Sequence, residues 1–132
     1  MSKMTVEVVT PERVVYSGQA EMVIARGVQG DLGILPNHMP MVTPLKTAPV
    51  QIKVEGDQTM RMAVSGGFME VRGDKVTILA ETAELPGDID VERAKAAKER
   101  AEKRLAEKYP EIDFQRAERA LQRALARLDV TK

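Results

Sequence analysis

The stretch Pro86-Gly87-Asp88-Ile89-Asp90-Val91-Glu92-Arg93-Ala94 divides the sequence into two halves with different hydrophobic periods. Before it, β-branched residues alternate with polar ones and turn residues recur about every eight to ten positions, which is typical of short strands. After it, the chain is a long run of alanine, glutamate, lysine and arginine, which favours helix. The sequence therefore predicts an all-β domain at residues 1–86 and an all-α domain at residues 87–132, an α+β fold.

The first half contains six segments in which apolar and polar residues alternate. They are Thr5–Val8, Ala20–Ile24, Val50–Val54, Met60–Ser65, Phe68–Val71 and Lys75–Ala80. Strands this short are expected in a sandwich. Glu55-Gly56-Asp57 and Arg72-Gly73-Asp74 separate strand pairs, and glycine supplies the positive φ that hairpin turns need. The second triplet is also an adhesion motif, but a hairpin turn accounts for the same three residues.

Prolines gather between the early and late strands of this half. They occupy positions 36, 40, 44 and 49. Proline cannot donate to a sheet ladder, so this stretch is expected to form an edge strand and a surface loop. Surface loops are where contacts with partners are made.

The second half has the signals of two helices joined by a turn. Asp90 is a natural N-cap for a first helix over residues 91–108, which Tyr109-Pro110 would end. Asp113 offers a second N-cap, for a helix that continues to about Leu128. We therefore expect an antiparallel helical hairpin.

The predicted seam between these helices is thin. The second helix offers Phe114, Ala117, Leu121, Ala124, Leu125 and Leu128, and the first offers Ala94, Ala97, Ala101 and Leu105. Alanine buries little apolar area, so at about 25 cal/mol per Å² the hairpin is held only weakly. A ligand or a partner could then decide its position. The alternative is a hairpin packed permanently on the sandwich, and composition does not choose between the two.

Four arginines of the second helix form a basic stripe, expected on the side away from its apolar face. They are Arg116, Arg119, Arg123 and Arg127. Like charges at this spacing repel by a few tenths of a kcal/mol per pair. A solvated charged face is one interpretation of the stripe. An anion or an acidic protein surface, which would turn the repulsion into attraction, is the other.

The composition excludes several classes of function. Twenty basic residues balance twenty acidic ones, which argues against a dedicated nucleic-acid binder. The absence of cysteine and the single histidine, His38, rule out a cysteine-rich or two-histidine metal site, and there is no phosphate loop ending in Gly-Lys-Ser or Gly-Lys-Thr. His38 lies in the proline-rich loop without an orienting partner, so no catalytic role is expected. No signal peptide is expected, since no basic segment is followed by an apolar run, and no run of about 18 apolar residues that could span a membrane is present.

Three blocks of the first half resemble one known family. Gly30-Asp31-Leu32-Gly33-Ile34-Leu35-Pro36-Asn37-His38-Met39-Pro40 is similar to the signature loop of the epsilon subunits of bacterial F-type ATP synthases. Ser65-Gly66-Gly67-Phe68-Met69-Glu70-Val71 resembles a second block of that family, and Val8-Val9-Thr10-Pro11 with Val15-Tyr16 a third. With the two-helix tail, the resemblance covers essentially the whole chain, in order.

The resemblance implies a flattened ten-stranded sandwich at the foot of the central stalk, in a non-catalytic subunit with no required cofactor. The partners it implies are the gamma subunit, the c-ring and the alpha/beta catalytic ring, at the cytoplasmic face of the bacterial cell membrane. Asp31 would face the c-ring, and His38 and Thr43 would meet gamma. Asn37 stands where many relatives have glycine, and asparagine tolerates a left-handed backbone, so the loop is expected to keep its shape.

The resemblance also implies that the hairpin is a mobile regulator. Lowered on the sandwich, it would permit turnover; raised along gamma, its basic stripe would meet the catalytic beta subunits and block ATP hydrolysis. Ile89-Asp90-Val91-Glu92-Arg93-Ala94 resembles the motif with which Bacillus-type relatives bind ATP on the lowered hairpin. Carried over residue by residue, the adenosine end would be held by Glu84, Ile89, Asp90 and Ala94, and the phosphates by Arg93, Arg100, Arg123 and Arg127.

Simpler interpretations of the same residues stay open. Asp90 could serve only as a cap and the arginines only as solubilising charges. A free-standing ATP-sensing module that reuses this hairpin is the alternative to a stalk subunit, and the two differ in their partners.

Overall fold

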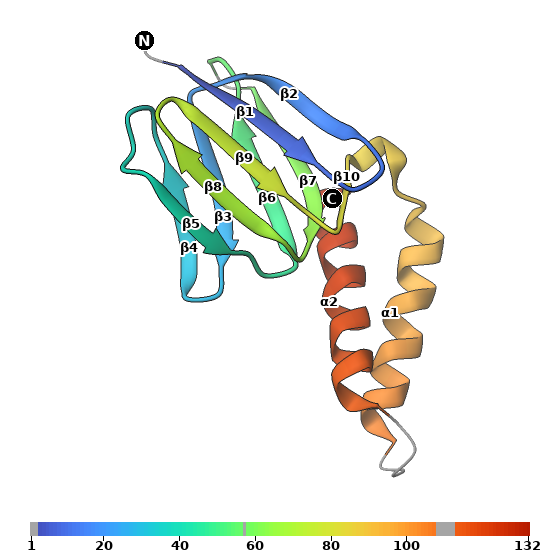
Figure 1. Ribbon diagram of the computed structural model, residues 1–132. Helices are drawn as coiled ribbons and strands as arrows, with labels where there is room; N and C mark the ends of the chain where they lie inside the picture. Colours follow the sequence, from blue (N-terminus) through green and yellow to red (C-terminus); the bar gives the residue numbers. More distant parts are fainter. Residues whose placement is uncertain (1–2, 57, 108–112) are drawn as a thin grey trace.

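The computed structural model describes residues 3–56, 58–107 and 113–132. In these residues, ten strands form two five-stranded sheets that face each other, and two helices follow them (Figure 1). The strands are β1 (Met4–Val9), β2 (Val14–Ala20), β3 (Met22–Gly27), β4 (Gly30–Ile34), β5 (Met41–Pro44), β6 (Ala48–Lys53), β7 (Thr59–Ser65), β8 (Phe68–Arg72), β9 (Lys75–Leu79) and β10 (Thr82–Glu84). One 3₁₀ turn, η1 (Pro86–Asp88), leads to α1 (Val91–Ala106) and α2 (Phe114–Val130). The predicted fold class, a sandwich followed by a two-helix hairpin, is confirmed.

The two sheets have the strand orders β2-β1-β9-β8-β5, here called sheet A, and β10-β7-β6-β3-β4, here called sheet B. The strand pairs described are antiparallel except β1 with β9, which is parallel. Alternate residues point between the sheets and are buried. The largest of them are Met4, Ile34, Ile52, Met62, Met69 and Ile78. Period-two alternation therefore accounts for the core, as the sequence indicates.

The prediction of one strand over Ala20–Ile24 was wrong. Ala20 ends β2 in sheet A, and Met22 begins β3 in sheet B. Glu21 lies at the corner between them, where its backbone N–H donates to the carbonyl of Lys53 at 2.7 Å. The buried positions change phase at the corner, from Ala20 to Val23 and Ala25. Because Met22 and Ile24 are apolar as well, the alternation in the sequence continues and does not reveal the change of sheet.

The proline-rich stretch is partly as predicted. Pro36 and Pro40 lie in the connection between β4 and β5, and Pro44 lies in the edge strand β5. Pro49 contradicts the expectation, because it lies in β6, which has a neighbour on each side. The sheet tolerates it since β3 pairs only with residues 51–53 of β6, which leaves Pro49 paired with β7 alone.

The passage from sheet B to sheet A depends on Gly66 and Gly67, which join β7 to β8 with φ angles of +65° and +92°. A Cβ on Gly67 would overlap the carbonyl oxygen of Leu79 and lie 2.8 Å from the Cα of Ala80. Only glycine lets the two chain segments cross at this separation. The block from Ser65 to Val71, which resembles the known family, is thus the place where the chain crosses from one sheet to the other.

The second glycine turn, between β8 and β9, is the hairpin expected from the Arg72-Gly73-Asp74 triplet. Arg72 pairs with Lys75, and Gly73 has a φ of +57°. Asn37 has a φ of +68°, so the expected left-handed backbone is confirmed, and its N–H donates to the carboxylate of Asp74 at 3.2 Å. This turn therefore anchors the proline-rich connection.

Both predicted helix caps are present. Asp90 Oδ1 accepts the backbone N–H of Arg93, and Asp113 Oδ1 accepts that of Arg116, each at 3.0 Å. The first helix ends at Ala106 rather than at residue 108, and the predicted stop at Tyr109-Pro110 falls outside the described residues. The second helix continues past Leu128 to Val130.

The hairpin lies beside sheet B, with α2 against β6 and β7 and with α1 packed on α2 (Figure 1). The contact with the sheet is a small apolar cluster in which Ala126 and Val130 of α2 meet Ala63 of β7, with Ile89 alongside. Ala94, Ala101, Ala117 and Ala124 are buried in the hairpin, so small residues dominate the packing as predicted.

The predicted apolar face of α2 was partly wrong. Phe114 and Leu125 are 43% and 40% exposed, whereas Ala126, which was not assigned to that face, is buried. At 100° per residue, Phe114 and Leu125 lie roughly opposite the mean direction of the arginines. The helix therefore turns its arginine side toward its neighbours and leaves part of its most apolar side in solvent.

Candidate functional site: a basic cleft between the two helices

A cleft of about 430 Å³ opens between α1, α2 and the segment that joins them to β10. It is lined by Glu84, Asp88, Ile89, Asp90, Arg93, Ala94, Ala97, Arg100, Ala101, Arg104, Arg116, Ala117, Ala120, Arg123 and Arg127. Its volume falls within the range of roughly 300–1,000 Å³ that is common for small-molecule sites.

The floor of the cleft consists of alanines from both helices. Ala94, Ala101 and Ala117 are buried, and Ala97 and Ala120 are half-buried. Because alanine carries only a methyl group, the helices pack closely here and still leave a hollow above the seam. The thin seam expected from the sequence is thus also what makes room for a ligand.

The walls of the cleft are strongly basic. Six arginines face three carboxylates, a formal excess of three positive charges. The carboxylate of Glu84 binds Nε of Arg127 at 2.6 Å, with both side chains less than a third exposed. Asp88 pairs at 3.6 Å with Arg13 of the sandwich, which does not line the cleft.

The other five arginines of the cleft form no ion pair within the described part of the chain. They are Arg93, Arg100, Arg104, Arg116 and Arg123. Guanidinium groups donate in a planar fork that matches phosphate oxygens, and they come here from both helices. The arrangement is one that can hold a polyanion across the hairpin.

The structure brings together all eight residues that the resemblance assigned to an ATP site, since Glu84, Ile89, Asp90, Arg93, Ala94, Arg100, Arg123 and Arg127 all line this cleft. Arg104 and Arg116 also line it and were not assigned to it. The signal for Arg104 was its spacing of four from Arg100, which places both on one side of α1.

The basic stripe of α2 is divided. Arg116, Arg123 and Arg127 line the cleft, and Arg119 lies instead in a shallow groove near the end of the hairpin with Leu105 and Phe114. At 100° per residue, the side chains of Arg116, Arg123 and Arg127 leave the helix axis within about 40° of one another, whereas that of Arg119 leaves it about 60° away from Arg116. Spacings of three, four and four therefore do not make one surface.

Family models account for nearly the whole chain. Residues 3–86 match the model described as the ATP synthase delta/epsilon chain β-sandwich domain, and residues 88–132 match the long α-helix domain of the same chains. The chain belongs to the ATP synthase delta/epsilon family.

Relatives named ATP synthase epsilon chain match along the full length. The chain is 86% identical to that of Brevibacillus brevis over 132 residues, which is 100% of both chains. It is 58% identical to that of Halalkalibacterium halodurans over 98% of both, and 54% identical to that of Bacillus licheniformis over 100% of both. The family resemblance is confirmed, and the chain is of the non-catalytic kind that these names denote.

Solved structures of ATP synthases share the fold. A chain of the Euglena gracilis mitochondrial ATP synthase matches with a TM-score of 0.81 and 21% identity, over 92% of this chain and 77% of the other. A chain from the central stalk and c-ring of the Tetrahymena thermophila mitochondrial enzyme matches with a TM-score of 0.62 and 14% identity, over 99% and 98%. At these identities the likeness concerns the fold alone.

The residues expected at the interfaces of the epsilon fold lie in two places. Asp31 is exposed in β4, where it pairs with Arg26 of β3 at 3.0 Å. Thr43 lies near the same β3–β4 turn, since a Cβ on Gly27 would be 3.6 Å from its hydroxyl oxygen. His38 follows the other end of β4, and its Nδ1 donates to the carbonyl of Met39 at 2.7 Å.

Two further observations bear on the sequence-based exclusions. Within the described ranges, no helix is long and apolar enough to cross a membrane. The same residues contain no group of three or more histidine, cysteine or acidic side chains placed to hold a metal.

Proposed function

We propose that this protein is the epsilon subunit in the central stalk of a proton-translocating bacterial F-type ATP synthase, and that its hairpin is an ATP-responsive brake on ATP hydrolysis. The β-sandwich at residues 1–86 would contact gamma and the c-ring, and residues 87–132 would form the regulatory unit. The subunit would then sit at the cytoplasmic face of the cell membrane, held there by its partners. Full-length similarity to epsilon chains favours this over a free-standing ATP sensor.

The observation that carries the ATP part of the proposal is the cleft. Arginines of α1 and α2 face one hollow, and in the described residues five of the six have no carboxylate partner. A polyphosphate would bridge the helices by charge-assisted hydrogen bonds, with the adenosine toward the Glu84 and Ile89 end. ATP would be a regulatory ligand here and not a substrate, since the three carboxylates of the cleft already bind Arg127, Arg13 and the backbone N–H of Arg93.

The regulatory consequence follows from linkage. The cleft exists only while α1 and α2 lie together, so ATP stabilises that form by RT ln(1 + [L]/Kd), about 2.7 kcal/mol at a hundredfold excess over Kd. Plentiful ATP would keep the hairpin lowered, and scarce ATP would release it. The exposed Phe114 and Leu125 support a second position, since a raised helix could cover them against a partner.

An apolar row on the outer face of sheet A supports the contact with gamma. Strand register places Pro44, Phe68, Leu79, Val9 and Val14 side by side across all five strands. Phe68, Leu79 and Val14 are each more than half exposed, on the sheet that the helices do not cover. Phe68→Ser should therefore weaken co-purification with gamma while leaving the ATP affinity of the isolated chain unchanged.

The test of the cleft is a calorimetric titration of the isolated chain with ATP and with ADP. Arg93→Ala and Arg123→Ala should each weaken ATP binding about tenfold or more, because each removes a charge-assisted contact worth roughly 1.5–3 kcal/mol. Arg119→Ala is the matched control, since it removes the same charge from the same helix outside the cleft. Equal effects of Arg123→Ala and Arg119→Ala, or no saturable binding at millimolar ATP, would refute the site.

The test of the brake uses the assembled complex. Removing residues 87–132 should raise its ATP hydrolysis rate at low ATP and change little at saturating ATP. A hydrolysis rate that is unaffected at every ATP concentration would show that the hairpin is not inhibitory.

A further inference from the structure

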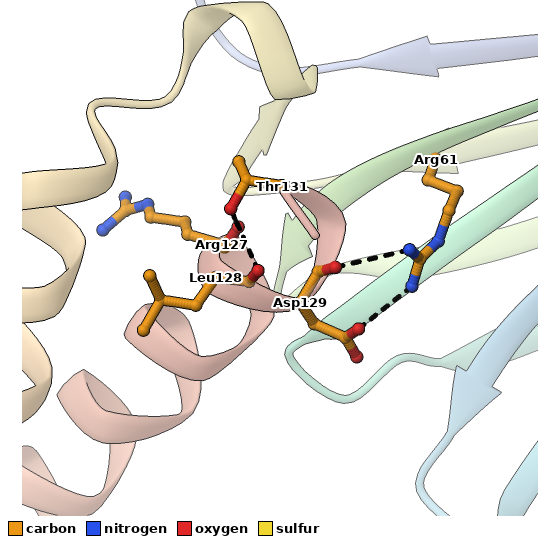
Figure 2. Close-up of polar contacts among 5 residues, drawn as sticks. All are labelled: Arg61, Arg127, Leu128, Asp129 and Thr131. Atoms are coloured by element: carbon orange, nitrogen blue, oxygen red, sulfur yellow. Dashed lines mark hydrogen bonds and ion pairs between the residues drawn. The ribbon is translucent and has the colours of Figure 1, made fainter.

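The end of α2 is fastened to the sandwich by one arginine. Arg61, on β7, donates from one terminal nitrogen to the backbone carbonyl of Asp129 at 3.3 Å and from the other to its carboxylate at 3.1 Å (Figure 2). In the described residues, this contact and the Glu84–Arg127 pair are the ion pairs that join α2 to the sandwich. The first does not involve the cleft.

Arg61 adds a side-chain donor to the cap of the helix. The side chain of Thr131 donates to the carbonyls of Arg127 and Leu128, at 3.3 and 2.9 Å (Figure 2). Arg61 donates to the next carbonyl, that of Asp129, which also accepts the backbone N–H of Lys132 at 3.3 Å. The last carbonyls of a helix lack intrahelical partners and carry partial negative charge, so a guanidinium is favourable there. Residues of two separate units thus satisfy one helix terminus.

Asp129 needs this partner more than an ordinary surface aspartate does. A carboxylate in the last turn of a helix lies at the negative end of the helix dipole, where it is unfavourable unless a cation is near. Raising the hairpin would leave the Asp129 carboxylate unpaired and its carbonyl without the guanidinium donor. The contact therefore favours the lowered position whether or not a ligand is bound.

The strength of the contact is limited. Nε of Arg61 is buried and has no acceptor in the described residues, which costs part of what the two terminal nitrogens gain. The Arg61 side chain is 33% exposed and that of Asp129 is 49% exposed, so solvent screens the pair. A contact of this strength can bias the hairpin without fixing it.

The geometry also links the contact to the cleft. Arg127 and Asp129 project from the same final turn of α2 in opposite directions, Asp129 toward Arg61 and Arg127 away from it (Figure 2). Holding Asp129 on β7 fixes the direction in which Arg127 enters the cleft, where it also binds Glu84.

We propose that Arg61 and Asp129 form a ligand-independent latch, which holds the last turn of α2 on β7 and positions Arg127 at the cleft. The latch sets the fraction of lowered hairpin before any nucleotide binds, and ligand binding adds to it. The positioning of Arg127 for ATP rests on the proposed function. The role of the latch in holding α2 on β7 does not depend on ATP binding.

The experiment measures docking directly by pulsed electron resonance. Because the chain contains no cysteine, spin labels can be attached at Glu12→Cys on the sandwich and Gln122→Cys on α2 without competing thiols. Arg61→Met and Asp129→Asn should each lower the ratio of docked to undocked hairpin about three- to tenfold in the absence of ATP. Asp129→Asn leaves the sandwich intact, so it reports on the latch even if Arg61→Met perturbs β7.

Controls separate the latch from general effects of charge. Arg26→Met removes an arginine from a similar Arg–Asp pair in the β3–β4 hairpin and should leave docking unchanged. Arg61→Asp combined with Asp129→Arg reverses the pair and should recover part of the docking lost by either single change. Unchanged docking in both single variants, or an equal loss in Arg26→Met, would overturn the latch.

Addition of ATP distinguishes the two proposals. If ATP shifts the wild-type population but the latch variants do not differ from wild type, the latch is wrong and the ATP site stands. If the latch variants undock but ATP shifts nothing in any chain, the ATP site is wrong and the latch stands. If both hold, the apparent ATP Kd of the latch variants rises at least by the factor by which docked hairpin is lost, and a rise beyond that factor measures the positioning of Arg127.

Discussion

Gly67→Ala tests the crossing point that joins the two sheets. An alanine would have to adopt a φ of +92°, which L-residues avoid at a cost of about 1–2 kcal/mol. Its Cβ would also overlap the carbonyl of Leu79 and lie 2.8 Å from the Cα of Ala80, both of which are backbone atoms that cannot rotate away. Moving the backbone apart costs about 1–3 kcal/mol more.

The expected loss of stability is thus about 2–5 kcal/mol. Gly73→Ala is the matched control, because Gly73 also has a positive φ, +57°, but a Cβ there would meet nothing within 4 Å. It should cost only about 1–2 kcal/mol. Urea unfolding followed by far-ultraviolet circular dichroism measures both values, and a difference below about 0.5 kcal/mol would refute the steric argument.

Two further predictions concern the hairpin. Asp113→Ala removes a helix cap and should lower helix stability by about 0.5–2 kcal/mol, measured by the thermal loss of helical circular dichroism, while leaving the intrinsic ATP affinity intact. Asp90→Ala should lower both helix stability and ATP affinity, because Asp90 caps α1 and also lines the cleft. Ala97→Leu should fill the hollow and weaken ATP binding at least about tenfold in a calorimetric titration. The spin-label distance that reports docking should stay that of wild type. Undiminished ATP affinity would contradict the assigned position of the ligand.

The sequence was sufficient for the overall architecture because the two periods differ. Alternation identified segments of β1, β3, β6, β7, β8 and β9, but not β2, β4, β5 or β10. The caps at Asp90 and Asp113 marked the helix starts, since these signals are local. The corner at Glu21 was not predicted, because the apolar Met22 and Ile24 continue the alternation although the buried positions shift to Val23 and Ala25. The sequence did not predict Pro49 in an inner strand, because the sheet tolerates proline there only as long as β3 does not extend along β6 as far as Pro49.

The cleft was predictable in its residues but not in its geometry. The family motif singled out eight residues, and the fold brings all eight to one hollow. The orientation of α2 was not foreseen, because amphipathicity assumes a single buried face and α2 packs against both α1 and the sandwich. The Arg61–Asp129 contact joins residues 68 positions apart, and no local sequence pattern predicts such a pair.

The most direct test of the nucleotide cleft is an amide chemical-shift titration of the isotopically labelled chain with ATP. Binding in the cleft should produce saturable shifts there, including at Arg93, Arg100 and Arg123, and should leave sheet A unchanged. On the opposite side of the hairpin, Lys95 and Lys98 line another groove, which offers positive charge without the converging arginines. Shifts confined to that groove, or none at millimolar ATP, would contradict the nucleotide cleft.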